Sequence, residues 1–97
     1  MEINKALQAT LNYINANGGL LHEWYVGITG NVEQRLFSDH AVDKQFGQWV
    51  HCTLSSSTDA RNLEAHMLRQ GCKGDVGGGD DNANIMYCYK ITTKTRQ

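Results

Sequence analysis

The sequence lacks the long apolar run of a membrane protein and the cysteine pattern of a secreted one. No apolar run reaches the roughly 20 residues that cross a bilayer, and MEINKALQ has no basic stretch followed by an apolar block. The 3 cysteines are odd in number, and no two of them form a Cys-x-x-Cys pair. These absences predict a protein with no membrane span that resides in the reducing cytoplasm.

The sequence also lacks proline, internal repeats and an excess of charge of one sign. The 9 Lys and Arg residues oppose 10 Asp and Glu residues, for a net charge of -1. Any contact with nucleic acid must therefore be local and not spread over a basic surface. With 97 residues, 40% of them apolar and none of them proline, the chain has the composition of one folded domain. We expect residues 1–97 to form a single domain.

Hydrophobic periodicity and capping residues predict three helices and three strands. The helices are expected at residues 3–16, 32–42 and 59–70, the last closed by Gly71. The strands are expected at residues 22–29, 48–54 and 85–92, with a glycine-rich loop at 73–84 and a frayed tail at 93–97. This order predicts one α+β unit, in which a three-stranded sheet is flanked by helices.

Glu64 stands out on the helix expected at 59–70. At 100° per residue it falls inside the apolar stripe that contains Leu63 and Met67. Burying a carboxylate alone costs several kcal/mol or shifts its pKa. Glu64 therefore either lies at the rim of the stripe, pairs with a cation, or binds a metal.

Tyr25 and Arg35 each allow a functional and a structural interpretation. Tyr25 shares a strand face with Gly27 and Thr29, whose small side chains leave room for its ring or for a ligand. It is otherwise a packed tyrosine with its hydroxyl in water. Arg35 lies on the flank of its helix and points its guanidinium either toward an anion or into a surface ion pair.

The segment around these two residues resembles the second half of the GIY-YIG nuclease motif. It contains a Tyr-Val-Gly strand at 25–27, a turn at Asn31 and Arg35 ten residues after the tyrosine. In that family a metal-binding glutamate lies on a later helix, often after an alanine-containing lead-in. Glu64, preceded by Ala60-Arg-Asn-Leu, is similar to it.

The resemblance implies a three-stranded antiparallel sheet and metal-assisted hydrolysis of a nucleic-acid phosphodiester. Glu64 would hold Mg²⁺ or Mn²⁺, whose remaining ligands are water and phosphate. Arg35 would bind a phosphate oxygen and stabilise the transition state, and Tyr25 would activate or position the attacking water. Gly27 and Asn31, at the start of the motif, are candidate substrate-binding residues.

The chain departs from the family in its first motif, a Gly-Ile-Tyr strand about ten residues before the second. Tyr13 has eleven residues between it and Tyr25, but it lies in a predicted helix and lacks the glycine. Either that helix is wrong, or the strand is absent and the final strand supplies Tyr87 or Tyr89 instead.

Two further positions differ. Many members carry a histidine four residues after the arginine, where this chain has Asp39 and, one place later, His40. A shift of one residue rotates a helical side chain by about 100°, and His40 is the candidate catalytic substitute for that histidine. The family's asparagine after the glutamate helix corresponds to Asn82 or to Asn84, which directly precedes the last strand. We prefer Asn84.

Three further sets of residues bear on binding. The amides of the glycine-rich segment either approach a phosphate or belong to a flexible turn. The cysteines and histidines show no spacing typical of a structural zinc site. Basic residues available for phosphate contacts are Arg61, Arg69, Lys73, Lys90, Lys94 and Arg96.

The leading hypothesis is a stand-alone endonuclease that acts on DNA. A nuclease this small would need a homodimer, a protein partner or relaxed recognition. The alternative is a catalytically silent regulator that binds nucleic acid or protein on the same scaffold. A third hypothesis is an interaction module without nucleic acid.

Overall fold

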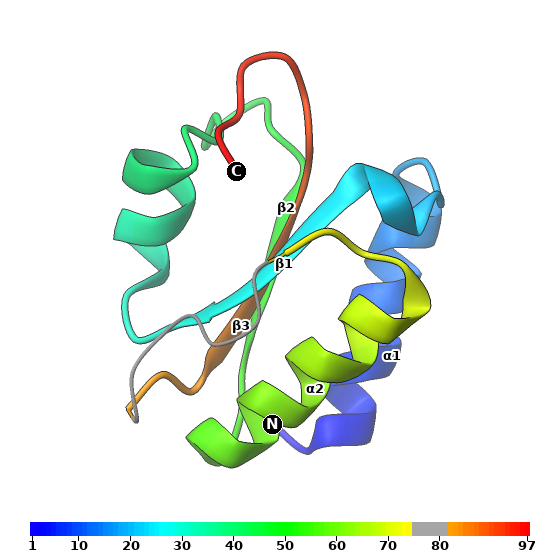
Figure 1. Cartoon of the computed structure of the whole chain (residues 1–97), viewed down its shortest axis with the longest axis vertical. Helices are drawn as coiled ribbons and strands as arrows, with labels where there is room; N and C mark the ends of the chain where they lie inside the picture. Colours follow the sequence, from blue (N-terminus) through cyan, green and yellow to red (C-terminus); the bar gives the residue numbers. More distant parts are fainter. Residues whose placement is uncertain (75–81) are drawn as a thin grey trace.

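A three-stranded antiparallel sheet separates two helices from a third helical segment in the computed structural model of the chain (Figure 1). The structure describes residues 1–74 and 82–97, so most of the predicted glycine-rich loop lies outside the described residues. The strand order is β1-β3-β2, which confirms the predicted α+β fold. The elements are α1 (Ile3–Ala16), a 3₁₀ turn (Leu21–Glu23), β1 (Trp24–Thr29), η2 (Gln34–Asp39), β2 (Trp49–Thr53), α2 (Ser57–Gln70) and β3 (Ile85–Lys90).

Both long helices begin at a side-chain cap and end near glycine. The carboxylate of Glu2 accepts hydrogen bonds from two amides of the first turn of α1, at 3.0 and 3.2 Å. Ser56 accepts the amide of Asp59 at 3.1 Å, so α2 begins at Ser57, two residues before the predicted start. Gly71, at φ 123°, closes α2 as predicted.

No helix in the described parts of the chain is long and apolar enough to cross a membrane.

The sheet has one face for the core and one for a cluster of tyrosines. Trp24, Val26 and Ile28 of β1 pack with Met86 and Cys88 of β3 against α1 and α2. The opposite face carries aromatic side chains beneath η2, namely Tyr25, Tyr87 and Tyr89. The alternation along each strand therefore agrees with the period of two in the sequence.

The strands differ from the prediction at their ends. Residues 22 and 23 belong to the 3₁₀ turn, so β1 begins at Trp24, and β2 is one residue shorter at each end than predicted. β3 ends at Lys90, because the chain then turns, with the Thr95 hydroxyl accepting the Thr92 amide at 3.0 Å. The tail is not frayed: the Arg96 amide donates to the His40 carbonyl at 2.7 Å.

The helical segment expected at 32–42 ends at Asp39, and its residues 34–39 form a π-helix. Ala41, at φ 56°, turns the chain away, and the Val42 amide donates to the Leu36 carbonyl at 2.9 Å. This left-handed position usually holds glycine, and its absence left the sequence without a signal for the helix end.

Asn31 and Gln34 have the residue types of a capping box at the start of this segment, and half of that box forms. The side-chain oxygen of Asn31 accepts the Gln34 amide at 3.2 Å. The amide of Asn31 donates to the Thr29 hydroxyl at 3.0 Å instead of to the Gln34 side chain. Asn31 is therefore a helix cap in this structure.

Candidate active site

The three tyrosines of the sheet lie together and are nearly inaccessible. Tyr25, Tyr87 and Tyr89 are 5%, 1% and 0% exposed, and the rings of Tyr25 and Tyr89 stack with centroids 5.3 Å apart. Tyr87 lies opposite Gly27 in the β1–β3 register. A Cβ on Gly27 would lie 2.5 Å from Cζ of Tyr87, so the glycine makes room for that ring across β1.

His40 connects this cluster to the tail of the chain. Its Nδ1 lies 2.6 Å from the carbonyl oxygen of Arg96, and its Nε2 lies 2.8 Å from the hydroxyl of Tyr87. A carbonyl oxygen only accepts hydrogen bonds, so Nδ1 carries the proton. In the neutral ring Nε2 is then an acceptor, and the Tyr87 hydroxyl donates to it. The Tyr89 hydroxyl donates to the same Arg96 carbonyl at 3.0 Å.

Burial keeps the imidazole of His40 neutral. His40 is 3% exposed, and burial lowers its pKa below the ordinary value of 6.5. The nearby charge of Arg35 lowers this pKa further, whereas the hydrogen bond to Arg96 opposes the shift. At neutral pH Nε2 therefore presents a free lone pair to the Tyr87 hydroxyl.

The π-helix brings Arg35 and His40 to the same tyrosine. The His40 amide donates to the Arg35 carbonyl at 2.9 Å, the i to i+5 bond of a π turn. A turn that closes over five residues places residue i+5 close to residue i on the helix surface. His40 therefore lies near Arg35 on the surface of this helical segment.

The guanidinium of Arg35 lies at the boundary between the cluster and solvent. Its Nη1 pairs with Asp39 at 3.0 Å, and the two side chains are 40% and 38% exposed. Burial raises the pKa of Tyr87 to about 12, and the positive charge and hydrogen bonding of Arg35 oppose that rise. Burial also raises the pKa of Tyr89. Both tyrosines are therefore neutral hydroxyls at neutral pH.

Glu64 is buried in the apolar stripe of α2, where the helical wheel places it. It is 3% exposed, and its Oε2 has no hydrogen-bond partner among the described residues. Burial raises the pKa of Glu64 to about 7, and the charge of Arg61 opposes that rise. The charge of Glu64 also makes a small contribution to the raised pKa of Tyr87.

Glu64 supplies the carboxylate oxygens that a hard divalent cation prefers. No group of three or more His, Cys, Asp or Glu side chains in the described part of the chain is arranged to hold a metal ion. Cys52, Cys72 and Cys88 are buried free thiols. A metal at this site would therefore take most of its ligands from water and substrate.

Tyr13 lies apart from this group. It is in α1, where its ring contacts Trp24 edge to face at 5.8 Å, and its hydroxyl accepts the Trp49 amide at 3.0 Å. The helix prediction is correct, so Tyr13 is not on a strand. β3 instead places Tyr87 beside β1, which was the second possibility for the missing tyrosine.

Two other predicted residues also have different partners. The side-chain amide of Asn84 donates to the Leu54 carbonyl at 3.5 Å, next to the end of β2. The ammonium of Lys90 donates to the Asn17 carbonyl at 3.5 Å. Neither makes a hydrogen bond to the tyrosine cluster among the described contacts.

Sequence reasoning missed the carbonyl of Arg96, because a backbone oxygen carries no signature of residue type. The shared strand face of Tyr87 and Tyr89 was the available signal for their joint presence.

No family model, curated protein or solved structure matches this chain. The functional interpretation therefore depends on the geometry of this site together with the motif resemblance.

Proposed function

We propose that this protein is a GIY-YIG-like endonuclease that hydrolyses nucleic-acid phosphodiester bonds, with DNA as the expected substrate and Mg²⁺ or Mn²⁺ as the metal. The observation that carries the proposal is the hydrogen bond from Tyr87 to the neutral His40, beside Arg35. Perturbed titratable groups gathered at one point are typical of catalytic sites.

The position of β3 supports the proposal despite the absent first motif. β3 pairs with the Tyr-Val-Gly strand along its whole length, and Tyr87 lies directly opposite Gly27. A tyrosine thus reaches the same neighbourhood from the end of the chain. Tyr25, stacked on Tyr89, becomes a packing residue in this scheme. Tyr87 takes the role of activating or positioning the water that the motif resemblance assigns to Tyr25.

The chemistry follows from the direction of the hydrogen bonds. As water attacks phosphorus, it gives a proton to the Tyr87 oxygen, which must first open to solvent from its 1% exposure, and the Tyr87 proton moves to Nε2 of His40. The new bond joins water oxygen to phosphorus, while the bond from phosphorus to the leaving oxygen breaks and that oxygen takes a proton from solvent. Arg35 exchanges its exposed pairing with Asp39 for a non-bridging phosphate oxygen.

The unsatisfied oxygen of Glu64 fits a divalent cation. Ionising a buried carboxylate with a raised pKa and an unpartnered Oε2 costs free energy when no cation is bound. A bound cation would supply charge neutralisation at the phosphate and the leaving oxygen. Glu64 is the one residue to which we assign metal binding.

A catalytically silent relative is the second candidate. It is favoured by the net charge of -1 and by Asp39, which neutralises Arg35 when no phosphate is bound. Such a protein would bind nucleic acid or a protein partner without cleaving.

The test is cleavage of supercoiled plasmid by the purified protein with Mg²⁺ or Mn²⁺, with an EDTA control. We expect nicking that is lost in Glu64→Ala and Arg35→Ala and kept in Glu33→Gln, a matched carboxylate change at an exposed ion pair. Retained binding without cleavage of DNA or RNA by the wild type would favour the silent relative.

A further inference from the structure

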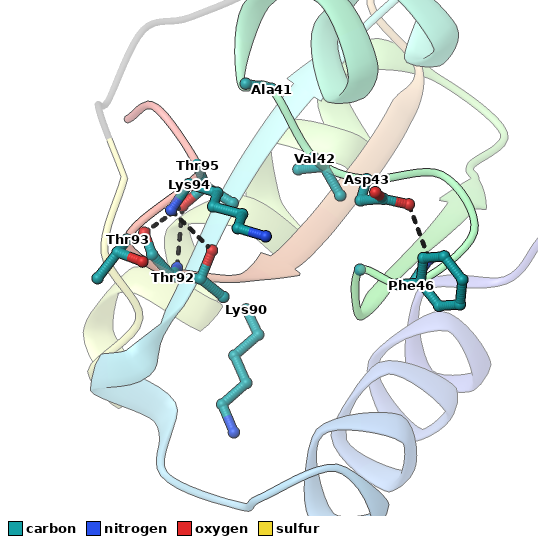
Figure 2. A pocket seen from close by; sticks show the side chains of 10 residues that line it. Ala41, Val42, Asp43, Phe46, Lys90, Thr92, Thr93, Lys94 and Thr95 are labelled. Atoms are coloured by element: carbon teal, nitrogen blue, oxygen red, sulfur yellow. Dashed lines mark hydrogen bonds between the residues drawn. The ribbon is translucent and has the colours of Figure 1, made fainter.

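A cavity of about 560 Å³ lies beside the candidate site, at the end of β3. One wall is the segment from Ala41 to Gly47, and the other is the turn from Thr92 to Thr95, with Lys90 between them (Figure 2). Its volume is within the range of about 300–1,000 Å³ that is typical of small-molecule sites. The cavity is therefore large enough for one nucleotide.

The polar groups of this cavity suit an anion. Lys90 and Lys94 are cations of the described lining, in which Asp43 is the one acid, and the Lys90 ammonium also donates to the Asn17 carbonyl at 3.5 Å. The Asp43 carboxylate already accepts the amides of Gln45 and Phe46 through Oδ1, at 2.9 and 2.8 Å. Two lysines against one carboxylate leave this lining with a net positive charge, which suits a phosphate.

Phe46 gives the cavity an exposed aromatic ring. It is 79% exposed, more than any other large apolar side chain of the described residues. The hydrogen bond from its own amide to Asp43 holds the Phe46 backbone, and Gly47 permits the tight turn, because a Cβ there would lie 2.5 Å from the Asp43 carbonyl. Figure 2 shows the Phe46 ring across the cavity from Lys94.

The cavity adjoins the candidate site at both of its walls. Ala41 follows His40 directly and holds φ at 56°, a conformation rare for alanine. Thr95 precedes Arg96, whose carbonyl binds the His40 ring. A strand that places one phosphate at Arg35 and Tyr87 would therefore pass its next nucleotides toward this cavity.

We propose that the cavity is a nucleotide subsite for single-stranded nucleic acid, in which Phe46 stacks on a base and Lys94, with Lys90, binds the neighbouring phosphates. The proposal rests on the proposed function for the position of the scissile phosphate and adds the substrate class. A base within a duplex has both faces stacked on its neighbours, whereas an unpaired base offers a free face to an aromatic ring.

Binding of fluorescein-labelled oligo(dT), oligo(rU) and a duplex of equal length, measured by anisotropy in EDTA, tests this subsite without cleavage. We expect a single strand to bind at least about tenfold more tightly than the duplex, and Phe46→Ala to weaken it by about 5- to 100-fold. Phe46→Trp should retain the affinity. Lys94→Gln should reduce the slope of log K against log salt by about 0.7, the value for one phosphate contact with a single strand.

Leu20→Ala is the matched control, since Leu20 is a second exposed apolar side chain, 53% exposed, outside the cavity lining. Comparison of oligo(dT) with oligo(rU) identifies DNA or RNA as the strand. Unchanged affinity in both Phe46→Ala and Lys94→Gln, tighter binding of the duplex, or no binding of either single strand would overturn the subsite. If the wild-type protein shows this binding but cleaves no substrate, the result counts against the nuclease proposal alone.

Discussion

His40 accepts the hydroxyl proton of Tyr87 in a hydrogen bond of 2.8 Å, because its other ring nitrogen is held 2.6 Å from the carbonyl of Arg96. The two contacts join residues that are 47 and 56 positions away from His40 in the sequence. The tail after β3 thus determines which nitrogen of the imidazole faces the tyrosine.

Removal of residues 95–97 should release the His40 ring. Without the Arg96 carbonyl and the covering backbone, the pKa of His40 should rise toward its ordinary value, because burial is the main cause of its lowering. Nitrogen-15 NMR should show the proton on Nδ1 in the full chain and a tautomer mixture in the shortened one. Cleavage should fall about tenfold, a fraction of what a general base contributes.

Thr93→Ala is the control for that deletion, since it changes the same turn but leaves Arg96 in place. An unchanged tautomer and pKa of His40 after the deletion would show that the tail does not hold the ring.

Glu64→Gln should change stability only at high pH. Burial raises the folded-state pKa of Glu64 from 4.5 to about 7, so its neutral form stabilises the fold below about pH 4.5 and that contribution is lost as pH rises through 7. The full loss amounts to at most about 3 kcal/mol. Urea unfolding should therefore give equal free energies of unfolding for the two proteins near pH 4.5 and a more stable variant at pH 9.

Metal provides a second comparison for Glu64. Mg²⁺ at pH 8 should stabilise the wild type and leave Glu64→Gln unchanged, since ligand binding to the folded state alone raises its stability. The exposed Glu33→Gln serves as control. The lowered pKa of His40 acts in the opposite sense, with stability lost as pH falls below 6.5, and it is common to all three proteins. An equal difference in the free energy of unfolding between wild type and Glu64→Gln near pH 4.5 and at pH 9 would contradict the raised pKa assigned to Glu64.

Gly27→Ala should displace the ring of Tyr87. The new methyl group would lie 2.5 Å from Cζ, and overpacking of this kind costs about 1–3 kcal/mol. Gly30→Ala is the matched control, because its nearest contact, the Asn82 carbonyl oxygen, is 3.9 Å from the added Cβ. The unfolding temperature and the cleavage rate should both fall in Gly27→Ala and stay near the wild-type values in Gly30→Ala. Equal values for the two variants would show that Tyr87 does not need this space.

The elements with a regular period were predictable from the sequence. Alternation in β1 and β3 separates Trp24 and Val26 from the tyrosines, and the helical wheel places Glu64 in the buried stripe of α2. These patterns depend on local geometry, which each segment carries in its own residues.

The rest of the site depends on long-range contacts and on backbone conformation. Nothing local states that β3 lies between β1 and β2, or that the Arg96 carbonyl reaches His40. The π turn ends at Ala41 in a left-handed conformation, where the sequence lacks the glycine that would mark it. The backbone hydrogen bond that brings His40 near Arg35 therefore could not be predicted from an α-helical wheel.

The most direct test is the cleavage rate of Tyr87→Phe beside Tyr13→Phe. Each substitution removes one hydroxyl, from the hydrogen bond to His40 in the first case and from the Trp49 amide in the second. We predict that Tyr87→Phe slows metal-dependent cleavage by about 10²- to 10⁴-fold, with oligonucleotide binding retained, while Tyr13→Phe cleaves at nearly the wild-type rate. Equal rates for Tyr87→Phe and the wild type would contradict the role assigned to the strand that ends the sheet.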